Sequence, residues 1–277
     1  DKVLKNHVFL ENEWATNGVY DVLDHADIKN AKGQFDKKMA ATIWQSRKYR
    51  DMHDELLALM VRFELCYEIP DQKDHFIAPQ LLSAQDPPIV AQWNNDNNLQ
   101  LRYEYEFMPK GILSRLMVRL HRYIHNAQNE AWKTGVIFTR QGAKIKVVET
   151  FDARSLYLSG TGTDVKDLMT IVADEIDALN NTYPNLTLKK WIPCICEECK
   201  NNPNLHFYKY DDIVRRKNNN KKTVECEISY TDVEINKLLD NVFTESHFSA
   251  KPHVQLTEAI KLQAVDLATQ QEFKRVF

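Results

Sequence analysis

The stretch of residues 101–151 constrains the fold most, because its hydrophobic pattern changes period. Residues 101–107 alternate apolar and charged side chains, which is typical of a strand with one face on a core and the other in water. In residues 112–124 the apolar side chains recur at spacings of three and four, which predicts an amphipathic helix. The chain therefore passes from a half-buried strand directly into a helix.

Two more strands are predicted in the same stretch, over residues 132–140 and 144–151. They are separated by Gln141 and Gly142, and glycine adopts the positive φ that a tight hairpin requires. A strand, a helix and a hairpin in this order predict a helix packed on an antiparallel sheet.

The chain of 277 residues is longer than a typical single domain, so we expect two compact units. Residues 83–100 are rich in turn formers and asparagine and predict the connection between them. We place an N-terminal subdomain at 1–98, a C-terminal subdomain at 99–245 and a tail at 246–277, in which residues 256–268 predict one helix. The first residue is Asp1, not Met, so we expect a fragment of a longer chain.

The N-terminal subdomain has the element order of a winged helix. Helices are predicted at residues 14–23, 39–46 and 52–63, and the last has the clearest apolar stripe. Residues 64–69 and 75–82 follow as a β-hairpin around a polar turn.

The C-terminal subdomain is predicted to contain further strands at residues 154–158, 186–192 and 223–228. A helix begins after Asp164 and extends to Leu179 on one apolar stripe, with Asp164 as its N-cap. The predicted fold class is α+β, with a winged-helix-like helical subdomain followed by an antiparallel or mixed sheet packed by helices.

The charge balance argues against nucleic acid as a partner. Residues 1–100 hold 11 lysines and arginines against 16 aspartates and glutamates, and the whole chain has a net charge of −3. A duplex binder needs a basic surface to displace counterions. A winged-helix transcriptional regulator with a C-terminal dimerisation domain is the alternative to a protein-docking function, and a DNA shift assay sensitive to salt would favour it.

The turn at residues 159–164, between a strand and a helix, is the only sequence feature that suggests phosphate binding. It has neither the third glycine of a dinucleotide motif nor the Gly-Lys-Ser/Thr ending of a phosphate loop. A tight turn capped by Asp164 explains the same residues. An enzyme using this turn is the weakest hypothesis, and without a catalytic constellation elsewhere we predict a non-catalytic chain.

Four of the five cysteines, Cys194, Cys196, Cys199 and Cys226, lie in one region, whereas Cys66 stands alone. This distribution does not suit a disulfide-rich secreted fold and favours a reducing, cytoplasmic location. Two of these cysteines have the spacing that lets both thiolates reach one tetrahedral ion, and a returning strand that carries Cys226 could complete a structural zinc site. The other interpretation, unrelated reduced thiols, stays open.

Arg115, Arg119 and Arg122 share one face of the predicted helix at 112–124. Such a stripe could dock an acidic partner, but the solvated side of an amphipathic helix is the favoured interpretation. No apolar run is long enough to span a bilayer.

Several phrases resemble, in the same order, the COR domain of Roco G proteins. These phrases, spread over roughly residues 4–245, are Leu4-Lys5-Asn6, Trp14-Ala15-Thr16-Asn17, Gly33-Gln34-Phe35, Phe63-Glu64-Leu65-Cys66-Tyr67, Pro79-Gln80-Leu81-Leu82, Phe107-Met108-Pro109-Lys110-Gly111 with Arg115-Leu116, and Trp132-Lys133-Thr134-Gly135-Val136.

The resemblance implies a Roc GTPase domain immediately upstream, and GTP and Mg²⁺ are expected only there. It also implies that the N-terminal half packs on Roc and that the C-terminal half mediates homodimerisation. Leucine-rich repeats commonly precede Roc in this family, and some members, including the leucine-rich-repeat kinases, carry a kinase after COR. The expected function is a homodimerisation and regulatory domain that couples dimerisation to the GTP cycle of Roc.

Six side chains are predicted to bind partners. The hairpin residues Tyr67, His75 and Phe76 are assigned to the contact with Roc, because aromatic side chains supply much of the binding energy of a domain contact. Tyr103, Tyr105 and Tyr157 are assigned to the contact with a second copy of the chain, across the exposed face of the sheet.

Overall fold

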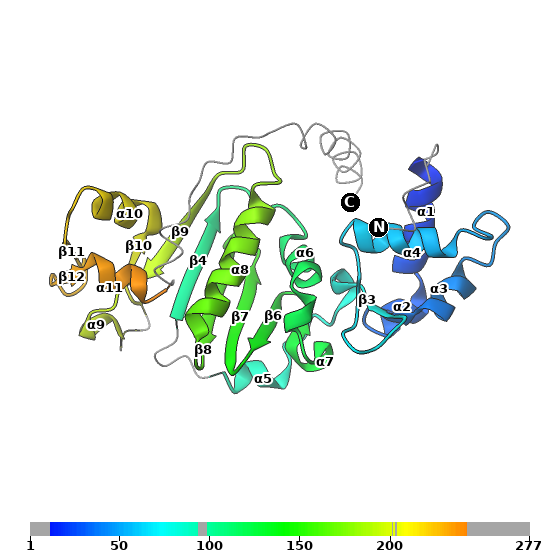
Figure 1. Cartoon of the computed structure of the whole chain (residues 1–277), viewed down its shortest axis with the longest axis horizontal. Coiled ribbons are helices and arrows are strands. Elements are labelled where there is room, and N and C mark those ends of the chain that lie inside the picture. Colours follow the sequence, from blue (N-terminus) through cyan, green and yellow to red (C-terminus); the bar gives the residue numbers. More distant parts are fainter. Residues whose placement is uncertain (1–11, 94–98, 201, 203, 243–277) are drawn as a thin grey trace. The chain divides into compact units, whose positions relative to one another are not determined.

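A computed structural model describes residues 12–93, 99–200, 202 and 204–242 of the chain (Figure 1). Both helices and antiparallel sheets are present in this part, so the predicted α+β class is confirmed. The helix predicted over residues 256–268 lies outside the described residues.

The N-terminal subdomain consists of helices and a small three-stranded sheet. Its helices are α1 (Asn12–Leu23), α2 (Ala26–Asn30), α3 (Lys37–Ile43) and α4 (His53–Arg62). Strands β1 (Gln34–Asp36), β2 (Tyr67–Glu68) and β3 (His75–Ile77) form an antiparallel sheet in the order β1-β3-β2. The three predicted helices and the hairpin are confirmed, while the winged-helix assignment stays a prediction.

The core of this subdomain lies between the helices. Trp44 is almost fully buried there, and its indole Nε1 donates to the Gly18 carbonyl of α1 at 2.7 Å. Leu56 and Met60 of α4 and Val19 of α1 are completely buried in the same cluster. The apolar stripe of residues 52–63 is therefore the face that packs on α1.

A connection follows with η1 (Pro79–Leu81) and the short helix α5 (Pro88–Ala91). The prediction that residues 83–100 form a connection without regular structure is wrong for α5 and for residues 99–100, where the next strand begins. Pro88 explains α5, since proline is pre-set for the first position of a helix.

The C-terminal subdomain is built on a seven-stranded sheet in the order β10-β9-β4-β8-β7-β6-β5, with every neighbouring pair antiparallel. Its strands are β4 (Leu99–Tyr105), β5 (Ala131–Trp132), β6 (Gly135–Arg140), β7 (Ala143–Thr150), β8 (Ser155–Thr161), β9 (Leu188–Pro193) and β10 (Phe207–Lys209). The β6–β7 hairpin turns at Gln141 and Gly142, both with positive φ, as predicted.

Helices α6 (Ile112–Arg119) and α8 (Val165–Asn180) lie over one face of this sheet, as Figure 1 shows. Alternate residues of β4 point toward them: Tyr103 donates its hydroxyl to the Ala173 carbonyl of α8, and Tyr105 donates to Asn180 Oδ1. The helix predicted over residues 112–124 ends at Arg119, and η2 (His121–Tyr123) and α7 (Ala127–Glu130) follow.

Beyond β9 the chain forms α9 (Glu197–Lys200), α10 (Tyr210–Asn218), β11 (Thr223–Glu225), β12 (Asp232–Glu234) and α11 (Ile235–Asp240). Strands β11 and β12 pair as a separate antiparallel hairpin. Among the described residues, no helix combines the length and the apolar character needed to cross a bilayer.

Candidate functional site

The four clustered cysteines converge on one point in the C-terminal subdomain. Their Sγ atoms all lie within 4.8 Å of one another, and none of the cysteines forms a disulfide. Cys194, Cys199 and Cys226 are buried, and Cys196 is half-buried. The four thiols therefore meet in space, and Cys226 reaches the other three from the position directly after β11.

Three separate segments supply these thiols. Cys194 follows β9, and its amide donates to the His206 carbonyl at 2.7 Å, which extends the β9–β10 pairing by one step. Cys196 and Cys199 lie just before and within α9. Cys226 follows β11 and begins the turn to β12, where its carbonyl accepts from the Tyr230 amide at 2.8 Å.

Polar groups surround the sulfur atoms. The Cys196 amide lies 3.5 Å from Cys194 Sγ, the Tyr208 hydroxyl 3.6 Å from the same sulfur, and the Ser229 hydroxyl 3.4 Å from Cys196 Sγ. Burial raises the pKa of Cys226, but hydrogen bonds from the Ser229 amide and hydroxyl and the Ile228 amide outweigh burial and lower it to about 6. Burial raises the pKa of Cys194 to about 11. The shifts within the cluster therefore have opposite signs: hydrogen bonds favour the thiolate at Cys226, and burial favours the neutral thiol at Cys194.

His206 is not a member of this cluster. Its imidazole packs edge-on against Tyr208, with ring centroids 4.5 Å apart, and its Nδ1 lies 3.7 Å from Glu227 Oε2. Its contribution to the site is made by the backbone: the carbonyl accepts from the Cys194 amide, and the amide donates to the sulfur of Cys199.

A second constellation joins the two subdomains around Glu64, which lies between α4 and β2. Its carboxylate accepts from Arg115 Nε at 2.5 Å and from Arg119 Nε at 2.6 Å, both on α6. We call these three side chains the Glu64 clasp. All three are mostly buried, with 15–25% of each side chain exposed.

The clasp continues onto α8 and the segment after it. Arg119 also donates to Glu175 Oε1 at 2.9 Å, and Arg115 donates to the Tyr183 hydroxyl at 3.1 Å. Burial lowers the pKa of Arg119, but the hydrogen bonds to Glu175 and Glu64 outweigh burial and raise this pKa above its ordinary value. The interpretation of this stripe as a solvated helix face is wrong for Arg115 and Arg119, because their acidic partners lie within the chain.

The sheet face opposite α6 and α8 carries a cluster of cationic and aromatic side chains. We call it the cation–aromatic face, and it consists of Arg102, Tyr157, Trp191, Phe207 and Lys209. In the strand register, Arg102 lies directly opposite Tyr157 of β8 on one side and Trp191 of β9 on the other. Its guanidinium carbon lies 4.7 Å from the Phe207 ring centroid and 5.3 Å from that of Trp191.

The cation–aromatic face is partly open to solvent in the described chain. Arg102 keeps 29% of its side chain exposed, Lys209 is exposed, and the three aromatic residues are half-buried. Farther along the same face, Trp93 covers β7 and β8, with its indole donating to Ser159 and Lys146 over its ring.

Of the six predicted partner-binding residues, four are buried. Tyr103 and Tyr105 lie under α8, Tyr67 stacks on His121 at 5.3 Å, and Phe76 stacks on Phe35 at 5.6 Å. Their apolar character, which suggested a contact with a partner, instead serves the core. His75 is exposed, and Tyr157 belongs to the cation–aromatic face.

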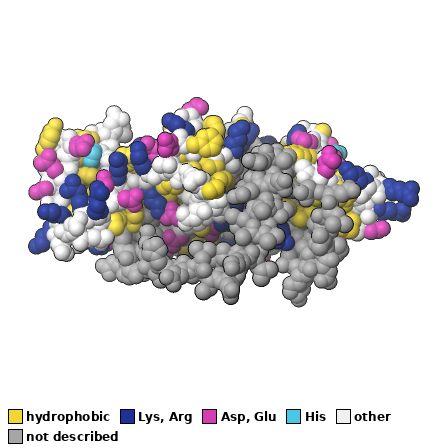
Figure 2. Space-filling model, turned by 90° about the horizontal axis from the view of Figure 1, so that it is seen from above, with side chains coloured by type: hydrophobic (Ala, Val, Ile, Leu, Met, Phe, Trp, Pro, Cys, Tyr) yellow, Lys and Arg dark blue, Asp and Glu magenta, His cyan; other side chains and the backbone are white. Residues whose placement is uncertain are grey.

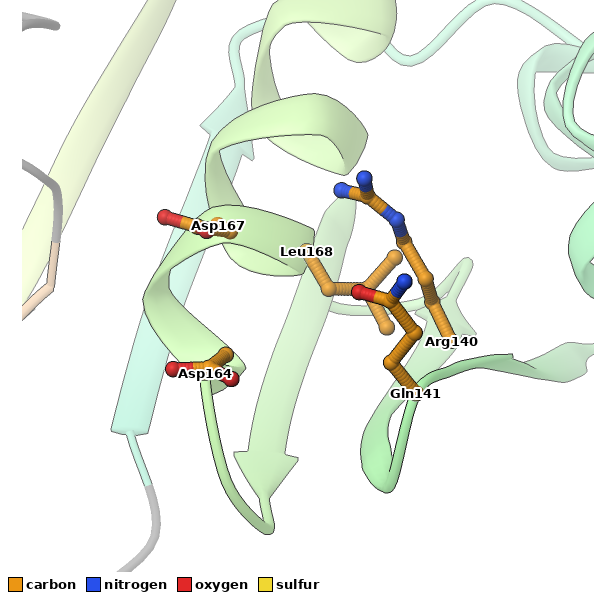
Figure 3. Close-up of a pocket in the computed structure, with 5 residues that line it drawn as sticks. All are labelled: Arg140, Gln141, Asp164, Asp167 and Leu168. Carbon is orange, nitrogen blue, oxygen red and sulfur yellow. The ribbon is translucent and has the colours of Figure 1, made fainter.

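The turn before α8 borders a small depression lined by Arg140, Gln141, Asp164, Asp167 and Leu168 (Figure 3). Asp164 occupies the N-cap position with φ 53°, but its side chain makes no capping hydrogen bond, so that part of the prediction is wrong. Figure 3 shows Asp167 pointing away from Arg140 and Gln141. Two carboxylates beside the helix N-terminus would repel a phosphate.

Comparison with protein families matches residues 1–82 to the family described as C-terminal of Roc, COR-A domain, and residues 96–241 to that described as C-terminal of Roc, COR-B domain. The connection that holds α5 lies between these two ranges.

Relatives among curated proteins point the same way. The chain is 26% identical over 203 residues to probable serine/threonine-protein kinase pats1 of Dictyostelium discoideum, covering 69% of this chain and 6% of that protein. It is 25% identical over 195 residues to a Roc-COR-CHAT protease from an unknown prokaryotic organism, covering 68% and 18%, respectively. A Roc-COR-CHAT protease of Runella zeae is 28% identical over 162 residues, covering 56% and 16%. The chain therefore spans less than a fifth of the length of each of these relatives.

Proposed function

The chain belongs to the COR family of Roco proteins, with a COR-A domain followed by a COR-B domain, and from this membership we propose that it is the homodimerisation and regulatory domain of a Roco-type GTPase. In this proposal COR-A packs on an upstream Roc domain, COR-B pairs with a second copy, and the chain couples the two events. In the same proposal, the Roc domain binds and hydrolyses GTP, and the COR domains do not take part in the reaction.

The cation–aromatic face is the observation that supports dimerisation best. Arginine and aromatic residues are enriched at the centres of protein interfaces, and they dominate binding energy there. The face also carries charges of both signs, because Glu104 lies beside Arg102 and directly opposite Lys189 of β9. A two-fold copy could therefore pair cations with anions from the same patch, as an isologous interface requires.

The Glu64 clasp supports the regulatory part of the proposal. It connects COR-A through α6 and Glu175 to α8, and α8 covers the sheet whose other face is the proposed dimer contact. A displacement of COR-A by Roc would act on α8 through these charged bonds. Buried networks of this kind have discrete arrangements, and coupling between sites depends on such two-state elements.

Packing on Roc would use the exposed parts of the β2–β3 hairpin. Residues 71–75 are exposed, whereas Tyr67 and Phe76 point inward. Of the three hairpin residues assigned to this contact, His75 is thus the one whose side chain a Roc domain could reach.

A DNA-binding regulator, the alternative from the sequence, has no support. The relatives named above are one kinase and two Roc-COR-CHAT proteases, and the N-terminal hundred residues carry more acidic than basic side chains. On the surface seen in Figure 2, lysine and arginine are interspersed with aspartate and glutamate and form no continuous basic stripe. Duplex binding depends on such a stripe.

Charge reversal at the cation–aromatic face is expected to weaken self-association. Arg102→Glu places a carboxylate between Trp191 and Phe207 and removes an interface arginine, so we expect the dimer dissociation constant to rise roughly 30-fold or more. Sedimentation velocity of the chain over a wide concentration range measures this. Lys209→Glu tests the same face from an exposed position, where folding is not at risk.

Lys166→Glu is the matched control, because Lys166 is exposed on α8, away from the cation–aromatic face. It should leave the monomer–dimer equilibrium unchanged. A chain that stays monomeric at high micromolar concentration, or a dimer that tolerates both face variants, would contradict the proposal.

A further inference from the structure

We propose that Cys194, Cys196, Cys199 and Cys226 bind one structural zinc ion in the COR-B domain. This site is independent of the proposed dimer contact, and it rests on the arrangement of the thiols. Four sulfur ligands from the chain close a tetrahedral site and leave no position for substrate.

The spacing of the sulfur atoms matches a tetrahedral ion. Zn–S bonds are about 2.3 Å long, so two sulfurs at the corners of a tetrahedron lie about 3.8 Å apart. Cys226 Sγ lies 3.6 Å from Cys199 Sγ and 3.8 Å from Cys196 Sγ. All six pairs fall within 4.8 Å, so a small movement of the side chains suffices to close the shell.

Disulfide bonding and a different cation both fit the cluster less well than zinc does. A disulfide needs sulfurs about 2.05 Å apart, whereas all these cysteines are free. Four thiolates in a tetrahedral arrangement favour zinc or iron among the common metals. Hard cations such as Mg²⁺, which prefer oxygen ligands, are disfavoured. Zinc is chosen over iron, because four cysteines around one ion are a common structural zinc site.

Polar groups around the sulfurs fit the orienting contacts of a metal site. The Cys196 amide, the Tyr208 hydroxyl and the Ser229 hydroxyl each lie within 3.6 Å of a cluster sulfur. Such donors orient thiolate ligands and disperse their negative charge, and they accompany most protein metal sites.

The site would hold together elements that are weak alone. α9 has four residues, and the β11–β12 hairpin has three residues in each strand. An isolated two-stranded hairpin is marginally stable in water. A zinc ion joining β9, α9 and β11 would fasten this hairpin to the edge of the sheet and keep β10 paired with β9.

Metal analysis of the purified chain tests the proposal. Reduced wild-type protein, expressed with zinc in the medium, should contain about one zinc per chain by mass spectrometry of the metals. Cobalt(II) exchanged into the site should show the visible bands of tetrahedral thiolate coordination. A strong chelator should lower the melting temperature, and zinc, but not magnesium, should restore it.

Matched substitutions locate the ion. Cys226→Ser should reduce bound zinc at least about tenfold, since loss of one thiolate weakens a closed site strongly. Cys196→Ser removes the half-buried ligand, where a misfolded product is less of a risk. Cys66→Ser is the control, because Cys66 is buried in the core of COR-A, outside the cluster, and zinc content should not change.

The proposal would be overturned if the purified wild-type protein contained no metal and its melting temperature did not change when chelator was added. Full zinc content in folded Cys196→Ser and Cys226→Ser, or iron in place of zinc, would also overturn it. None of these outcomes bears on dimerisation through the cation–aromatic face, so the two proposals can fail separately.

Discussion

Gly33→Ala is expected to destabilise the COR-A domain by roughly 2–5 kcal/mol. Gly33 connects α2 to β1 with φ +82°, a conformation that costs an L-residue about 1–2 kcal/mol. An added Cβ would also lie 2.4 Å from the Ala78 carbonyl oxygen, which belongs to the backbone after β3. Because the Ala78 amide donates to the Gly33 carbonyl at 2.9 Å, neither segment can move aside without losing that bond.

Gly111→Ala is the matched control for the clash. Gly111 precedes α6 with φ +83°, and a Cβ there would meet nothing within 4 Å. This variant should therefore show only the conformational cost, about 1–2 kcal/mol. Urea unfolding of both variants, with hydrogen exchange of α1 and α4 to follow COR-A alone, measures the difference. If both variants lost the same free energy of unfolding, the close contact between the added Cβ and Ala78 would be relieved without an energetic cost.

Breaking the Glu64 clasp is expected to loosen the contact between COR-A and COR-B. Glu64→Ala leaves Arg115 and Arg119 largely buried without their shared carboxylate. Removing one partner of a buried ion pair costs about 3–5 kcal/mol, and the partial exposure here reduces that to roughly 1–3 kcal/mol. Hydrogen exchange at α6 and η1 should rise, because these elements meet at this contact.

A double-mutant cycle isolates the clasp from other effects of substitution. Glu64→Ala and Arg115→Ala should show a coupling free energy of about 1 kcal/mol or more. The Lys37–Asp54 pair is a suitable control cycle, since its side chains are 44% and 58% exposed, and its coupling should be about 0.5 kcal/mol or less. If the two cycles gave the same coupling, the clasp would be no more than a surface ion pair.

The sequence predicted much of the fold because the relevant patterns are local. The alternation in residues 101–107 predicted β4, observed two residues earlier as Leu99–Tyr105. The stripe after Asp164 predicted α8, and the glycine at 142 predicted the hairpin turn. Each of these signals depends on side chains within a few residues of one another.

The elements that the sequence missed have little pattern. In α10 Ile213 is the one buried residue, so no apolar stripe marks the helix. Strands β10 and β12 have three residues each, too few to show a period. Such elements form because their neighbours hold them, which makes their prediction from the sequence unreliable.

The sequence by itself determined the α+β class and the order of the main elements, and it singled out four cysteines in one region. Only the structure brings their sulfur atoms within 4.8 Å of one another. The tertiary structure alone decided which side chains remain at the surface. Tyr103 and Tyr105 have the same pattern in the chain whether a helix or a partner covers them, and only α8 shows that they are core. Glu64 lies 51 residues from Arg115, and no local period records a contact made across such a distance.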